Sequence, residues 1–130
     1  MQYHMSGILA IVIAMLMMDW AWLSSTSVST KQMFARLQGQ PLEFKWIPAA
    51  LTYLIMTAAV YFFAVEPADT WITAAGRGAA MGFVMYGVYD FTNYATLAKY
   101  PLSFALTDLA WGTFMCATVA AIGKYASSTD

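Results

Sequence analysis

Four long apolar segments limit what this sequence can fold into. They lie at residues 6–25, 46–65, 73–96 and 102–123, and each can cross a hydrocarbon core of about 30 Å, which takes about 20 helical residues. Backbone groups in lipid must be hydrogen-bonded within the protein, and these segments lack the alternation of barrel strands. The sequence therefore predicts an all-α membrane protein, with four antiparallel transmembrane helices in one compact bundle over residues 1–130.

The composition favours the same class. Hydrophobic residues make up 61% of the chain and charged residues only 10%, against about 45–50% and about 25% in soluble domains. The first apolar run lacks a basic flank, and Asp19 and Trp20 stand where a cleavage site would need small residues. We therefore expect a retained span and not a signal peptide. The lipid bilayer is the expected partner; nucleic acid is not, because the chain has no basic run.

Basic residues predict the orientation in the membrane. One face of a four-span chain carries four of them, Lys31, Arg36, Lys45 and Lys99, and the other face carries two, Arg77 and Lys124. Lys and Arg concentrate on the cytoplasmic side of membrane proteins. Both termini are therefore predicted to lie on the non-cytoplasmic side.

Two local patterns leave alternatives open. Met33, Phe34 and Leu37, in the polar connection between the first two spans, fit a short interfacial helix or an ordinary loop. Gly78 and Gly82 form a GxxxG spacing in the third span. That spacing allows close helix contact, either at a dimer interface or within the four-helix unit.

Three acidic residues lie inside predicted spans: Asp19, Asp90 and Asp108. From the helical rise of about 1.5 Å per residue, all three fall in one layer, roughly 5–8 Å from the bilayer centre. Reversing the orientation moves them together, so the common depth does not depend on it. We call these three residues the carboxylate layer.

Polar and aromatic residues accompany the carboxylate layer. The sequences DWAW (19–22) and DLAW (108–111) each place a Trp three residues after an Asp, on the same helical face. The expected companions of the three carboxylates are Tyr53, Tyr86, Asn93, Trp22 and Trp111.

The energetic cost of the layer favours a functional interpretation. A charged Asp at the centre of a membrane helix costs about 2.5–3.5 kcal/mol, and no Lys or Arg lies at this depth. The carboxylates must share protons, bind a cation, or accept hydrogen bonds. Ligand or ion binding is one interpretation, and the locking of helices by hydrogen bonds is the other.

Other chemistries lack their residues. The only histidine, His4, lies at the edge of the first span, and the only cysteine, Cys116, cannot form a thiolate cluster. No Ser-His-Asp set and no phosphate-binding loop is recognisable. The sequence identifies no cofactor and leaves the identity of any metal open.

Long stretches resemble one known family. The run YGVYDFTNYATL…YPLSFALTDLAWGTF (86–114), with DWAWL (19–23) and residues 49–67, is similar to the DUF2177 family of small membrane proteins. The resemblance implies four spans and adds no activity, and no catalytic residue is carried over. This chain departs from the family in its many Met residues and its more polar first connection.

The sequence supports three hypotheses. The first is a transporter-like protein whose carboxylate layer binds a proton, a cation or a small polar solute, as a homo-oligomer because four spans enclose little volume. The second is a non-catalytic accessory subunit of a larger membrane complex. The third, a membrane enzyme using an Asp pair as acid and base, needs two carboxyls within reach of one substrate.

Overall fold

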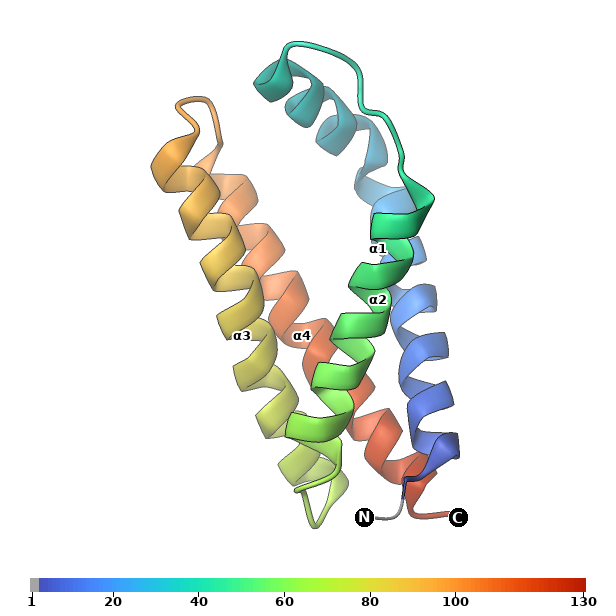
Figure 1. Cartoon of the computed structure of the whole chain (residues 1–130). Coiled ribbons are helices and arrows are strands. Elements are labelled where there is room, and N and C mark those ends of the chain that lie inside the picture. Colours follow the sequence, from blue (N-terminus) through green and yellow to red (C-terminus); the bar gives the residue numbers. More distant parts are fainter. Residues whose placement is uncertain (1–2) are drawn as a thin grey trace.

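The computed structural model describes residues 3–130, which form four helices joined by short connections (Figure 1). Helix α1 spans Met5–Gln38, α2 spans Trp46–Val60, α3 spans Trp71–Thr96, and α4 spans Leu102–Ser127. A π-helical turn, η1, continues α2 over Tyr61–Val65. No strand occurs among the described residues. The predicted all-α bundle is confirmed.

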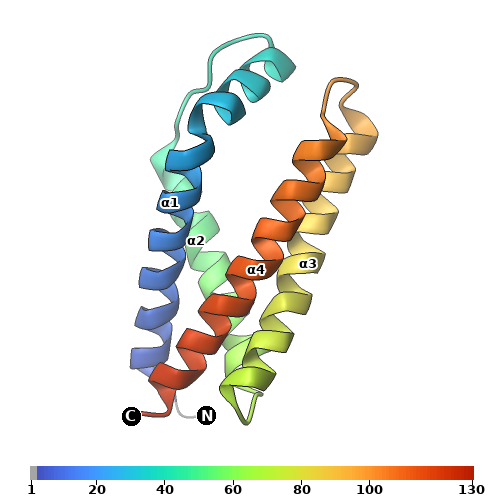
Figure 2. The ribbon, with the colours of Figure 1, turned by 180° about the vertical axis from the view of Figure 1, so that it is seen from behind.

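Three of these helical segments are long and apolar enough to cross a membrane: Met5–Gln38, Trp46–Val65 and Leu102–Ser127. Helix α3 is not among them, although its 26 residues suffice in length. It lies antiparallel to α4 along most of its length, in the most extensive helix pair of the described chain (Figures 1 and 2). That α3 also crosses the membrane stays a prediction.

Helix α1 is longer than the sequence predicts. We expected a span ending at residue 25, followed by a loop or a short interfacial helix. The loop is wrong; Met33, Phe34 and Leu37 are helical, but as the end of α1 and not as a short helix. One helix of 34 residues runs to Gln38 and ends at Gly39, whose φ of 77° and N–H bond to the Ala35 carbonyl (2.9 Å) close its last turn. At about 1.5 Å per residue, α1 is about 51 Å long and exceeds the hydrocarbon thickness.

The polar run at residues 24–30 bends α1 without ending it. The hydroxyls of Ser25 and Thr26 donate to the carbonyls of Ala21 and Trp22, at 2.8 and 2.9 Å. Hydroxyls that bond the preceding turn in this way often bend a helix. Beyond this point α1 leans toward the turn between α3 and α4 (Figures 1 and 2).

The leaning end of α1 packs against the α3–α4 turn through a small apolar cluster. Met33 on α1 is buried with Tyr100 of the turn and Ala105 on α4, and Phe34 packs edge-on against Phe104, with ring centroids 5.8 Å apart. The last third of α1 therefore covers one end of the α3–α4 pair.

A second and larger core fills the other end of the bundle, where the two termini lie (Figure 1). Its members come from all four helices and η1; fully buried examples are Ile11, Met15, Val60, Met115 and Cys116. At the same end the His4 N–H donates to the Tyr61 hydroxyl at 2.9 Å. This end of the bundle is closed by close packing.

The GxxxG spacing of α3 packs against α4 of the same chain. A Cβ on Gly78 would lie 2.6 Å from the Cβ of Ala120 and would collide with the Cys116 carbonyl oxygen. A Cβ on Gly82 would collide with the carbonyl oxygen of Gly112. Both glycines therefore permit the close approach of α3 and α4, as expected for packing within the four-helix unit.

Candidate functional site

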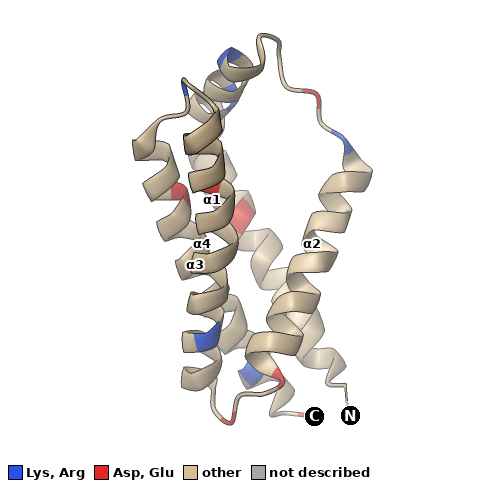
Figure 3. Cartoon of the chain, turned by 60° about the vertical axis from the view of Figure 1, so that its left-hand side comes forward, with Lys and Arg blue, Asp and Glu red and all other residues tan. Residues whose placement is uncertain are grey.

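The three acidic residues of the helices lie at one level of the bundle. In Figure 3 the red segments of α1, α3 and α4 are at about the same height, and the other acidic and basic residues lie toward the ends. Asp19 is on α1, Asp90 on α3 and Asp108 on α4. Within residues 3–130 the one ion pair joins His4 and Asp130, so none of the three carboxylates is paired with Lys or Arg.

Asp90 is the most buried of the three, with no exposed surface. The Tyr100 hydroxyl donates to Asp90 Oδ1 at 2.7 Å. The other oxygen, Oδ2, is buried and has no hydrogen-bond partner among the described residues. An isolated buried polar atom is costly, so Oδ2 requires an explanation.

The Asp108 side chain lies beside that of Asp90, close enough for the two carboxyl groups to interact. A hydrogen bond between two carboxyl groups needs one proton, because two ionised carboxylates are both acceptors and repel each other. The structure thus brings together one pair from the carboxylate layer, Asp90 and Asp108, across the α3–α4 contact.

Tyr100 holds this pair from outside the helices. It sits in the turn between α3 and α4, where its N–H donates to the Leu97 carbonyl at 3.0 Å and its side chain is 3% exposed. Burial, and then the hydrogen bond to Asp90, raise the pKa of the Tyr100 hydroxyl, which therefore remains a donor at neutral pH. Asn93, on the same face of α3 as Asp90, also lies beside this hydroxyl.

Asp19 is held by residues of two other helices. The Tyr53 hydroxyl of α2 donates to Asp19 Oδ2 at 2.8 Å, and the Trp111 indole N–H of α4 donates to Oδ1 at 3.2 Å. The indoles of Trp22 and Trp111 stack with centroids 4.7 Å apart and planes 6° apart. The two Asp-x-x-Trp sequences therefore meet across α1 and α4.

Asp19 and Asp108 line the same hollow, which we call the inner cleft. It has a volume of about 210 Å³ and is lined by residues of α1, α3 and α4, including Tyr86 and Tyr89. The Tyr86 ring lies against Gly112, where a Cβ would collide with it. Every residue that the sequence suggested as a companion thus lies close to at least one of the three carboxylates.

An outer cleft of about 310 Å³ adjoins the inner one and shares Thr26, Thr30 and Asp108 with it. It continues between α1 and α4 to Arg36, past the hydroxyl residues Ser29 and Thr107. The two clefts together lead from Asp108 to Arg36, near the end of the bundle opposite the termini, and both apolar and hydroxyl side chains line them.

Sequence reasoning missed Tyr100 and the hydroxyl residues of α1. In the sequence Tyr100 stands at the end of an apolar segment, where interfacial aromatic residues are common, and only the neighbouring Pro101 indicates a turn. Thr26 and Thr30 fell in the run taken for a connection. Their spacing of four, which puts them on one helical face, is the signal that they belong to α1.

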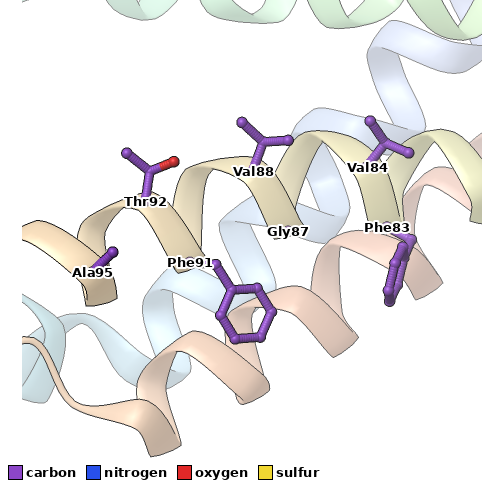
Figure 4. A pocket seen from close by; sticks show the side chains of 7 residues that line it. All are labelled: Phe83, Val84, Gly87, Val88, Phe91, Thr92 and Ala95. Carbon is purple, nitrogen blue, oxygen red and sulfur yellow. The ribbon is translucent and has the colours of Figure 1, made fainter.

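An open groove near the middle of α3 contains none of these residues. It has a volume of about 640 Å³ and runs along the outer face of one helix, between Phe83, Phe91 and Thr92 (Figure 4). Across the described residues, no three His, Cys, Asp or Glu side chains are grouped to hold a metal ion. The carboxylates and their clefts are therefore the candidate site.

Comparison with known families agrees with the fold and the motifs. The model of the family described as "Predicted membrane protein (DUF2177)" matches residues 4–125. The chain belongs to the DUF2177 family. The resemblance that the sequence suggested is confirmed over nearly the whole chain. No curated protein and no solved structure matches it.

Proposed function

We propose that the Asp90–Asp108 pair binds a proton within the membrane and that this site serves transport across it. The proposal rests on the surroundings of Asp90 Oδ2. This oxygen is fully buried and has no hydrogen-bond donor among residues 3–130. Its carboxyl group lies beside Asp108. One proton between the two carboxyls supplies the missing hydrogen bond. It also reduces the negative charge placed in a region of low dielectric constant.

The surroundings of the pair differ on its two sides, which favours controlled access. On one side the outer cleft leads from Asp108 toward Arg36. On the other side the core around Met15, Met115 and Cys116 is closed, with none of these side chains exposed. A proton can thus reach the pair from one end of the bundle while the other end is sealed. Transport requires a second conformation in which the sealed end opens.

We infer that the open end faces the cytoplasm, because it carries the basic residues Lys31, Arg36, Lys45 and Lys99. A reporter fused after Asp130 is expected to be accessible to a membrane-impermeant label in intact cells. A reporter inserted after Gly39, in the connection between α1 and α2, is expected to be labelled only after permeabilisation. The reverse labelling pattern contradicts this orientation, although it leaves the common depth of the carboxylates intact.

Proton flux in reconstituted vesicles tests the proposed function. Vesicles containing the wild-type protein should dissipate an imposed pH gradient faster than empty vesicles, and Asp108→Asn should reduce the rate to that of empty vesicles. Asp69→Asn, in the exposed turn before α3, serves as the matched control and should keep the wild-type rate. A wild-type rate equal to that of empty vesicles or of Asp108→Asn removes the proposal.

The transporting unit is proposed to be a homo-oligomer, because one copy encloses clefts of only about 210 and 310 Å³. The alternative remains an accessory subunit of a larger membrane complex. Purification in a mild detergent distinguishes the two hypotheses. A homodimer that contains no other chain supports the first, and stoichiometric co-purification of other membrane proteins supports the second.

A further inference from the structure

The inner cleft combines negative charge with an aromatic wall. Asp19 and Asp108 line it together with six aromatic residues, Trp22, Phe34, Tyr86, Tyr89, Phe104 and Trp111. Aromatic faces attract cations, and the attraction grows to about 2 kcal/mol or more when the cation loses its water. Carboxylates with aromatic walls are the chemistry that recognises an organic ammonium group.

We propose that the inner cleft binds the ammonium group of a small amine, a ligand class that rests on the proposed function of the carboxylates in transport. The ammonium lies between Asp19 and Asp108, beside the stacked indoles of Trp22 and Trp111. Each indole has one face covered by the other, at a centroid distance of 4.7 Å, and both residues line the cleft.

The hydrogen bonds of Asp19 agree with this ligand. Both of its donors, Tyr53 and Trp111, are neutral groups, so they stabilise the ionised carboxylate without cancelling its charge. In the described chain no Lys or Arg forms an ion pair with it. Asp19 thus has no cationic partner among the described residues, and a bound ammonium would supply one.

The size and lining of the cleft argue against a drug-sized ligand and against a divalent metal ion. Its volume of about 210 Å³ is below the range of about 300–1,000 Å³ that holds drug-sized molecules. A divalent metal ion would need several oxygen ligands at short range, and among residues 3–130 no three His, Cys, Asp or Glu side chains are grouped in this way. The hydroxyls of Thr26 and Thr30 line both clefts and can accept hydrogen bonds from an incoming amine.

The test is a binding titration of the full chain in detergent micelles, read by tryptophan fluorescence. Ethylammonium chloride should change the emission with saturation. Sodium chloride at the same ionic strength and n-propanol, a neutral molecule of similar size, should not. Asp19→Asn and Trp22→Leu should each weaken ethylammonium binding about tenfold or more, and Trp71→Phe, at the exposed start of α3, should leave it unchanged.

Two outcomes overturn the inference: an equal response to sodium chloride, or unchanged ethylammonium affinity in both Asp19→Asn and Trp22→Leu. If ethylammonium fails to bind while Asp108→Asn still abolishes proton flux, the amine site is wrong and the proton site stands. Adding phosphatidylethanolamine to the micelles shows where the natural ammonium group comes from. If the lipid competes with ethylammonium, the site binds a lipid headgroup. If it does not compete, the site binds a soluble amine, and either result supports an ammonium site.

Discussion

The Asp90→Asn variant is expected to fold as stably as the wild-type protein and to have lost its proton flux. The amide keeps a carbonyl oxygen to accept from Tyr100, as Asp90 Oδ1 does at 2.7 Å. Its NH2 group can donate to Asp108, which lies within reach. The neutral amide thus supplies the hydrogen bond that the shared proton would make, but it cannot bind or release a proton.

Asp90→Leu provides the matched comparison. Leucine is similar in size but leaves the buried Tyr100 hydroxyl without its acceptor, at a cost of about 1–3 kcal/mol. Thermal unfolding in detergent should therefore show a lower midpoint for Asp90→Leu than for Asp90→Asn, while pH-gradient dissipation is lost in both. Wild-type flux in Asp90→Asn would show that the carboxyl pair only joins helices. Equal destabilisation in the two variants would show that the Tyr100 contact contributes nothing.

Gly82→Ala is expected to destabilise the bundle far more than Gly76→Ala, although both glycines lie on α3. A Cβ at position 82 would collide with the Gly112 carbonyl oxygen and lie 2.8 Å from the Cβ of Cys116. At position 76 a Cβ has no described atom within 4 Å. Backbone atoms cannot move aside as flexible side chains do, so α3 and α4 must separate. Overpacking of this kind costs about 1–3 kcal/mol.

Thermal unfolding of the two variants in the same detergent measures this difference. The midpoint should fall for Gly82→Ala and stay near the wild-type value for Gly76→Ala. Gly82→Leu should lower it further, since the longer side chain must also fit between the two helices. Equal midpoints for the two alanine variants would contradict the close α3–α4 contact that aligns Asp90 with Asp108.

The architecture and the common depth of the carboxylates follow from features that a sequence records directly. Segment length and apolar composition predict four helices, although not the full length of α1, and the fixed rise per residue places Asp19, Asp90 and Asp108 at one level. The sequence does not show how each helix is rotated about its own axis. That rotation determines which side chains meet: Asp90 lies beside Asp108, whereas Asp19 accepts hydrogen bonds from Tyr53 and Trp111.

The wrong end of the first helix and the missed role of Tyr100 have a common physical origin. The run of Ser and Thr at residues 24–30 has the composition of a connection, but its hydroxyls bond to the backbone of the preceding turn and stay in the helix. The extra length of α1 then carries Met33 and Phe34 over the α3–α4 turn. A turn residue such as Tyr100 becomes buried only after that packing, so local sequence cannot identify it as a partner of Asp90.

Infrared spectroscopy of the reconstituted protein tests the central claim most directly, because the C=O stretch of a protonated carboxyl group differs from that of a carboxylate. At neutral pH the wild-type protein should show a protonated carboxyl band that shifts in D2O. The band should disappear or shift in Asp90→Asn and in Asp108→Asn, and remain in Asp69→Asn. A wild-type spectrum without this band, or a band unchanged in both pair variants, would contradict a proton held between Asp90 and Asp108.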